Sequence, residues 1–369
     1  MPSHGVPMLT PAPLVANTHL KAMHELASGV DALYLSARVA LPMPFVARLE
    51  QARQWANDLR QAAPCRLGDL WFGVAPHGWG KYRFCLDHTM ARLGFTESRH
   101  LPSMRVQPRA EFLHAVGPEG VVRALGELLE PELGPLRFSV SRLDLFVDVQ
   151  GWMLTLGDAQ RFVCRADARR TYEMDGRLTG FEFGSRKTKA LHARIYDKRA
   201  DVEAKGTSWW LEVWGDRLAE DLSVHRVEFE LGRQGLVEFG IDTPAEALEA
   251  TGDLWRYATG EWLTHRSPTA DATRTRWPIS APWSFVQGAS LRHQAVGLAR
   301  LQGTRRRTSI SRLLPGVNGY LVSLAALLGT DDIEDTLGAV GHHLHTYEIA
   351  SHTPFAERVA RRRSELELR

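Results

Sequence analysis

Apolar and polar side chains alternate along four segments in the middle of the chain, with the period of a β-strand that buries one face. These segments are residues 137–150, 178–186, 191–198 and 224–232. Shorter patterns precede them and predict strands at 30–39, 70–74, 81–86 and 103–107, and helices at 44–62 and 119–129. A helix capped by Asp158 is also predicted over 158–167. The pattern as a whole predicts an α+β fold with an antiparallel sheet.

The order strand, helix, strands occurs twice, which predicts a sheet built from two related halves. The halves cover about 29–130 and 137–248, and together they form a predicted catalytic domain over 29–248. Residues 1–28 are rich in Pro, Ala and polar side chains and predict a flexible arm. Helical patterns dominate after Pro244, so we expect 249–369 to be a helical, arginine-rich accessory region that binds DNA.

The charge distribution suggests a partner. The net charge is only +2, but residues 263–312 hold nine arginines against one acid, Asp271. This stretch includes the run Arg305-Arg306-Arg307, and a second basic excess lies at 186–205. Clustered bases suit phosphate groups, because each phosphate contact releases counterions. A GC-rich genome alone would also enrich arginine, so charge does not decide the matter.

Other composition features restrict the class of protein. Cys65, Cys85 and Cys164 are widely spaced, which argues against a disulfide framework and a Cys-x-x-Cys site and fits a cytoplasmic location. No apolar run approaches a membrane span of about 20 residues, and we expect neither a secretory signal nor a membrane partner. The phosphate-loop pattern GxxxxGK[ST] is absent, so a built-in helicase motor is not expected.

Charged groups and one tyrosine occupy the polar face of the four central strands. They are Arg142, Asp144, Asp148, Glu182, Arg194, Tyr196, Lys198, Arg226, Glu228 and Glu230. If the strands are sheet neighbours, these side chains converge. A cluster of carboxylates favours Mg²⁺ or Mn²⁺, and nearby cations would favour the phenolate form of Tyr196 as a nucleophile. The alternative is a solvated face on which Arg and Glu form cross-strand pairs.

Three segments carry a resemblance to a known family. SRLDLFVDV, GFEFGSRKTKALHARIYDKRAD and HRVEFEL resemble the replication initiation factor family (Rep_trans), which initiates rolling-circle replication of plasmids and phages and includes related conjugative relaxases. The shared pattern is Arg-x-Asp, Gly-Ser-Arg, Arg-x-Tyr-Asp-Lys and Arg-x-Glu on successive segments. It covers about residues 137–232, and the region after 250 adds almost nothing to it.

The resemblance implies metal-dependent, origin-specific nicking of DNA through a 5′-phosphotyrosine. It makes Tyr196 the nucleophile and Asp144 and Glu228 the ligands of Mg²⁺ or Mn²⁺. Arg194, Lys198 and Arg186 would bind phosphate or activate the phenol. Face geometry adds Glu182, Asp148 and Glu230 as weaker metal ligands. The expected DNA contacts are Arg142, Arg186, Lys187, Lys189, Arg226, Arg305, Arg306 and Arg307.

The expected partners are single-stranded or hairpin origin DNA, a host helicase and polymerase, and a second copy of the chain. Two alternatives to a replication initiator stay open: a conjugative relaxase with the same chemistry, and a DNA-binding regulator that has lost catalysis. A further nicking family uses a His-hydrophobic-His metal motif on a strand. Here His342-His343-Leu344-His345 lies in a helical pattern, which favours a polar helix face.

Overall fold

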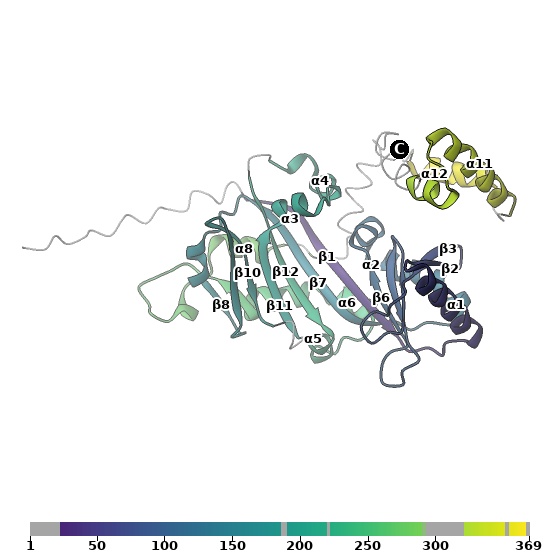
Figure 1. The fold of residues 1–369 in the computed structure, drawn as a ribbon. Helices are drawn as coiled ribbons and strands as arrows, with labels where there is room; N and C mark the ends of the chain where they lie inside the picture. Colours follow the sequence, from purple (N-terminus) through teal and green to yellow (C-terminus); the bar gives the residue numbers. More distant parts are fainter. Residues whose placement is uncertain are drawn as a thin grey trace, which may run out of the picture. The chain divides into compact units, whose positions relative to one another are not determined.

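In the computed structural model, the described residues are 23–185, 190–219, 222–289, 291, 321–350 and 354–366. The chain divides into two compact units, Met1–Leu298 and Ala299–Arg369, called unit 1 and unit 2 below. The part of unit 1 that is described contains an eleven-stranded antiparallel sheet in the order β2-β3-β4-β5-β6-β1-β7-β12-β11-β10-β9 (Figure 1). This confirms the predicted α+β class.

The two halves of the sheet start from the central pair β1 and β7, and each adds its remaining strands outward in the same reversed order. The first half comprises β1 (His24–Ala37), α1 (Met43–Leu59), β2 (Ala63–Leu67), β3 (Leu70–Val74), β4 (Phe84–Asp87), β5 (Ala91–Phe95), β6 (Met104–Pro108) and α2 (Ala110–Leu133). The second half comprises β7 (Ser139–Gln150), η2 (Leu156–Gln160), β8 (Phe162–Cys164), β9 (Arg169–Met174), β10 (Arg177–Phe183), β11 (Leu191–Asp197), α3 (Lys198–Lys205), α4 (Trp209–Trp214), η3 (Gly215–Arg217) and β12 (Val224–Gly232).

The predicted helix over 158–167 is wrong. The chain forms only the short 3₁₀ helix η2, whose cap is Thr155 rather than Asp158, and then the strand β8. Asp158 instead closes a capping box by accepting a hydrogen bond from the backbone N–H of Thr155 at 2.8 Å. The strand forms because β8 pairs with β13 (Leu263–His265), about a hundred residues later in the chain.

The segment after the sheet also belongs to unit 1, so the domain boundary predicted at 248/249 is misplaced. It comprises α5 (Arg233–Glu238), α6 (Pro244–Glu249), α7 (Thr251–Tyr257), η4 (Ala258–Trp262), β13, η5 (Arg274–Arg276) and α8 (Ala281–Gln287). Trp255 and Trp283 from this segment are buried in the main core. The C-terminal unit is helical, with α11 (Ile333–Ala350) and α12 (Phe355–Leu366). No helix in the described part of the chain is long and apolar enough to cross a membrane.

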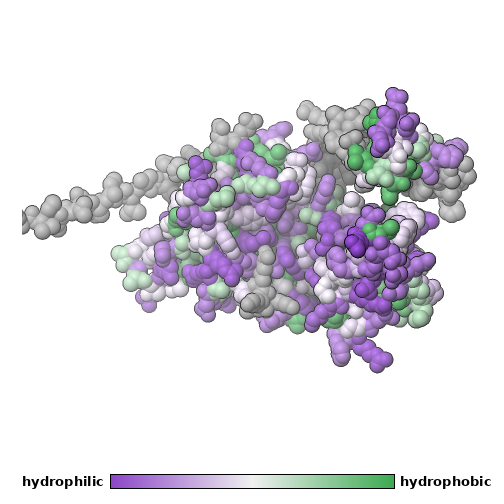
Figure 2. All heavy atoms as spheres, in the orientation of Figure 1, coloured by the Kyte–Doolittle hydropathy of each residue, from purple (hydrophilic) through white to green (hydrophobic). Residues whose placement is uncertain are grey.

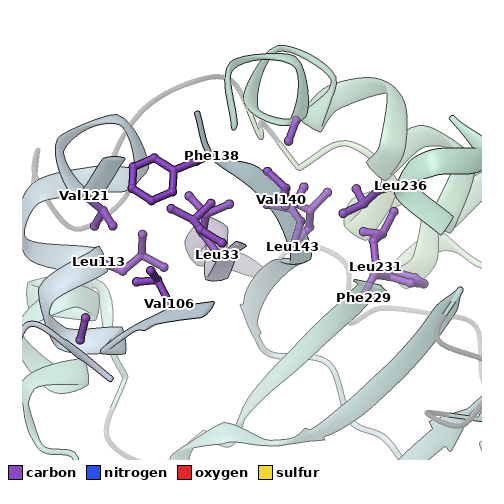
Figure 3. Packing of buried hydrophobic residues seen from close by; sticks show 14 of the residues in the cluster. Leu33, Val106, Leu113, Val121, Phe138, Val140, Leu143, Phe229, Leu231 and Leu236 are labelled. Carbon is purple, nitrogen blue, oxygen red and sulfur yellow. The ribbon is translucent and has the colours of Figure 1, made fainter. Parts of the chain in front are cut away.

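One face of the sheet forms the hydrophobic core. Its apolar side chains pack under α1, α2 and the helices that follow β12, as Figure 3 shows for Leu33, Val106 and Phe229. Each such side chain, when fully buried, contributes about 1.5–3 kcal/mol. The opposite face is polar, and over β1 and β7 it is covered by α4, whose Trp210 packs against Phe146. The core therefore fixes the strands and leaves the polar face for the site.

Candidate active site on the polar sheet face

The strand register brings the predicted residues together on one face. Directly paired residues share a face in an antiparallel sheet. Tyr196 on β11 pairs with Arg226 on β12, which pairs with Asp148 on β7. One row along, Arg194 pairs with Glu228. Figure 2 shows that hydrophilic residues predominate over these strands on the side seen in Figure 1. The prediction that alternating positions define one polar face is confirmed.

Tyr196 lies near the end of β11 with a half-buried ring. Its hydroxyl donates a hydrogen bond to Glu228 Oε2 at 3.2 Å. The guanidinium carbon of Arg194 is 5.5 Å from the ring centroid and Lys198 Nζ is 5.8 Å from it. Burial and the neighbouring Glu228 raise the pKa of Tyr196 well above 10, and Arg226 and Arg194 oppose that rise. The resting side chain is therefore a phenol with a carboxylate placed to accept its proton.

Glu228 is held by two groups from β11. Arg194 Nη2 donates to its Oε1, and the Tyr196 hydroxyl donates to its Oε2. The carboxyl is almost fully buried, while the side chain of Arg194 is 34% exposed. A phosphate that approaches Tyr196 from the open side would thus meet Arg194 first.

Lys198 is the first residue of α3, directly after the site strand. Asp197 caps this helix by accepting from the N–H of Ala200 at 3.0 Å, which fixes the turn out of β11. Lys198 Nζ bonds Asp201 Oδ2 at 3.1 Å. Burial and the positive charge of Arg226 lower the pKa of this ammonium. Lys198 therefore loses its proton more easily than a surface lysine.

A second acidic group lies beside Glu228. Arg142 Nε donates to Asp144 Oδ1 at 2.7 Å, and its Nη2 lies 3.0 Å from Glu230 Oε2. Burial raises the pKa of Asp144 to about 8 in spite of these bonds, and Glu228 and Glu230 add to the rise. Three carboxylates thus share two guanidinium groups, from Arg142 and Arg194.

This donor set fits a divalent cation in charge but not in its present arrangement. A cation would offset the negative charges of Glu228 and Glu230, which add to the effect of burial in raising the pKa of Asp144. Within the described residues, however, no group of three or more His, Cys, Asp or Glu side chains is placed to hold one ion. Asp144 and Glu228 each bind a guanidinium instead. A metal at these two residues requires Arg142 or Arg194 to move.

The structure corrects two assignments, those of Arg226 and Asp148. Arg226 has no exposed surface, so the prediction that it contacts DNA is wrong. It bonds both oxygens of Asp148 at 2.7 and 2.8 Å and Asp31 at 2.6 Å. Its guanidinium carbon lies 4.0 and 4.1 Å from the ring centroids of Phe146 and Trp210. Asp148 is fully buried and also accepts from an indole N–H, which leaves it no free oxygen for a metal.

Glu182 on β10 belongs to a separate cluster. It accepts hydrogen bonds from Tyr172 and from Arg170, and its Oε1 lies 2.6 Å from His192 Nε2. Although burial opposes the change, these bonds lower the pKa of Glu182 to about 2. Glu182 is therefore bonded to Tyr172, Arg170 and His192. It does not join Asp144 and Glu228 in the predicted metal cluster.

Six of the predicted DNA contacts lie outside the described residues: Arg186, Lys187, Lys189, Arg305, Arg306 and Arg307. The His342-His343-Leu344-His345 segment lies on α11, a helix, as expected.

Sequence reasoning missed Asp31, which bonds Arg226 and lies 3.4 Å from His114 Nε2. Burial raises the pKa of Asp31, but Arg226 and His114 outweigh it and hold that pKa far below its usual value. By strand parity Asp31 belongs with the core residue Leu33. A β-bulge between Val30 and Ala32 turns it towards the polar face. The signal for Asp31 in the sequence was an acidic residue at a strand position whose alternation predicts a core side chain.

The fold is similar to that of a solved protein, while the sequence comparisons find no match. No family model matches the chain, and no curated protein matches it in sequence. Among solved structures, a rolling circle replication initiator protein from Geobacillus stearothermophilus aligns with a TM-score of 0.45 and 14% sequence identity. The alignment covers 73% of this chain and 98% of that chain. A similarity of this extent assigns no function to the chain.

Proposed function

We propose that the chain is a rolling-circle replication initiator that nicks one strand of its origin DNA, with Tyr196 as the nucleophile. The observation that carries this proposal is the hydrogen bond from the Tyr196 hydroxyl to Glu228 on an open polar face. Arg194 and Lys198 flank the same ring. Nucleophile, proton acceptor and phosphate-binding cations are thus within reach of one another.

The reaction balances with these groups. The phenol oxygen attacks phosphorus, a new O–P bond to Tyr196 forms, and the bond to the 3′ oxygen breaks. Glu228 takes the phenol proton, and the departing 3′ oxygen takes a proton from water. The hydroxide that remains takes the proton from Glu228, so the net proton count is unchanged. The products are a 5′-phosphotyrosine and a free 3′-hydroxyl. Because the pKa of Tyr196 is well above neutral, a positioned base such as Glu228 is required.

The cations around Tyr196 offset the charge of the phosphate. Arg194 is partly exposed and its planar group suits phosphate oxygens. Lys198 Nζ lies 5.8 Å from the Tyr196 ring centroid, so its ammonium would add a second positive charge near the phosphate. Preorganised charges of this kind stabilise the pentavalent transition state without reorganisation.

We also propose that nicking depends on Mg²⁺ or Mn²⁺ held by Asp144 and Glu228, with Glu230 as a further ligand. The bound ion would neutralise charge on the transferred phosphate. Three carboxylates pair with only two guanidinium groups, so this set of side chains has one more negative than positive charge, which supports this proposal. Asp144→Ala and Glu228→Ala should abolish nicking and retain DNA binding. Undiminished nicking in excess chelator would contradict the metal requirement alone.

The test of the nucleophile uses labelled oligonucleotides that tile the DNA flanking the gene, incubated with the full chain and Mn²⁺. We expect a cleaved strand and a covalent protein–DNA adduct on a denaturing gel. Tyr196→Phe should remove both. Tyr172→Phe, on the exposed strand β9 of the same sheet, is the matched control and should retain both. An adduct that persists in Tyr196→Phe would refute the assignment, and DNA binding without any adduct would favour a non-catalytic regulator.

A further inference from the structure

The polar face continues from the site into the first half of the sheet, where two aromatic rings contact arginines. The guanidinium carbon of Arg105 on β6 lies 4.2 Å from the ring centroid of Trp79 and 5.9 Å from that of Tyr34. Arg92 on β5 lies 5.6 Å from Trp79. We call these four residues, Tyr34, Trp79, Arg92 and Arg105, the Trp79–Tyr34 surface.

A tight turn and a glycine place Trp79 on the sheet. Trp79 pairs with Tyr82 across the turn between β3 and β4. Its ring lies on Gly94 of β5, since a Cβ at that position would lie 3.1 Å from the indole. Gly94 pairs with Arg105, so the ring and the guanidinium occupy the same face. The half-buried indole is therefore held in a fixed position that still has exposed surface.

Tyr34 connects this surface with the candidate active site. Gln107 Nε2 donates to its hydroxyl at 2.7 Å, which fixes the ring. Arg142 pairs with Tyr34 across β1 and β7, and its guanidinium carbon lies 4.9 Å from the ring centroid. The same Arg142 binds Asp144 in the site. Arg142 and Asp148 are six residues apart on β7, so this face spans about 20 Å along the strand.

The charge of this region is complementary to an anion. Asp87 is the acid paired with Arg92, and Arg109 shares the same carboxylate. No carboxylate among the described residues forms an ion pair with Arg105. Around Tyr34, Arg142 and Arg105 are matched by Asp144 and Glu230, so the excess of arginine over acid lies on the Trp79 side. Positive groups interleaved with aromatic rings are the means by which proteins bind the phosphates and exposed bases of single strands.

We propose that the Trp79–Tyr34 surface binds a single-stranded nucleic acid that continues from the phosphate at Tyr196. The proposal rests on the proposed function, which supplies the strand. Bases in a duplex cover one another's faces, whereas unpaired bases stack on aromatic rings and on arginine planes. The stacked pair of Trp79 and Arg105 offers such a plane, and Arg105 and Arg92 offer phosphate contacts.

The test measures binding of a fluorescent oligo-dT of about 16 nucleotides, the upper range of single-strand sites, to the full chain at several salt concentrations. We expect Trp79→Leu to weaken binding about tenfold, the loss of one stacked base. Arg105→Gln should weaken binding and lower the slope of log affinity against log salt by about 0.7, one phosphate contact. Arg256→Gln, on the exposed surface of α7, is the matched control and should bind as the wild type.

The outcomes separate this proposal from the nicking proposal. Oligo-dT carries no origin, so its binding is measured without cleavage and in Tyr196→Phe as well. Wild-type affinity and salt slope in both Trp79→Leu and Arg105→Gln would overturn the proposal, as would absence of binding by the wild type. If both variants weaken the binding of duplex DNA as much as the binding of oligo-dT, the proposal is overturned and the surface binds duplex DNA instead. A thermal melt of each variant shows whether Trp79→Leu has unfolded, and Arg105→Gln, which changes a half-buried side chain, then decides alone.

Discussion

Removal of the Arg226 guanidinium tests whether buried charge pairs hold the strands that carry the site. Arg226 and Asp148 are both fully buried, and Asp31 is 19% exposed. Arg226→Ala leaves Asp148 buried with only the indole N–H of Trp214 as a donor. Breaking a buried pair in this way costs about 3–5 kcal/mol. We therefore expect a loss of at least about 4 kcal/mol, because the ring stacking is lost as well.

The loss is large relative to a typical total stability of about 5–15 kcal/mol. The assay is urea unfolding followed by tryptophan fluorescence. All eleven tryptophans lie at or before Trp283, so the signal reports on unit 1. Arg256→Ala removes an exposed pair with Asp253 and should cost less than about 1 kcal/mol.

A second variant separates the two contributions to the loss of stability, the lost packing of the Arg226 side chain and the unpaired negative charge of Asp148. Asp148→Asn in the Arg226→Ala background removes the uncompensated carboxylate and should restore part of the stability, by about 1 kcal/mol or more. If Arg226→Ala unfolds within about 1 kcal/mol of the wild type, the range of an exposed pair, the ion pair does not stabilise this part of the sheet. The reasoning from burial would then be refuted.

Two further predictions concern the position of the proposed nucleophile, Tyr196, and the response of stability to acid. A Cβ at Gly180 would lie 2.8 Å from the Ile195 carbonyl oxygen and 3.0 Å from Tyr196 Cβ. Gly180→Ala should therefore displace Tyr196 and lower the single-turnover nicking rate at least about tenfold, with DNA affinity unchanged. An unchanged nicking rate would contradict this. Burial lowers the pKa of His265 below 6.5 although Asp158 opposes the change, so the unfolded chain binds more protons below pH 6.5. The free energy of unfolding should therefore fall with decreasing pH, by at most about 1.4 kcal/mol per pH unit for this group. His265→Gln should make the urea midpoint depend less steeply on pH between pH 7 and 5. An equally steep dependence in the variant would argue against a role of His265.

The sequence was sufficient for the faces of the strands because their period of two is local information. Alternation along 224–232 places Glu228 and Phe229 on opposite faces, and the register agrees. The helix predicted over 158–167 failed for a non-local reason. The short strand at 162–164 is stabilised by Leu263–His265, and no pattern within ten residues carries that information.

Strand period also does not reveal which acid is neutralised by which arginine. Arg226 could face DNA or the interior with the same alternation, and the choice depends on Asp31, which a bulge in another strand turns towards it. Once Asp31 and Asp148 together bind Arg226, these charges are satisfied inside the fold. Arg194 then remains as the partly exposed guanidinium next to Tyr196. The division between arginines buried in ion pairs and arginines that stay partly exposed is thus set by pairing across strands, which is why the residue types could be predicted and their surroundings could not.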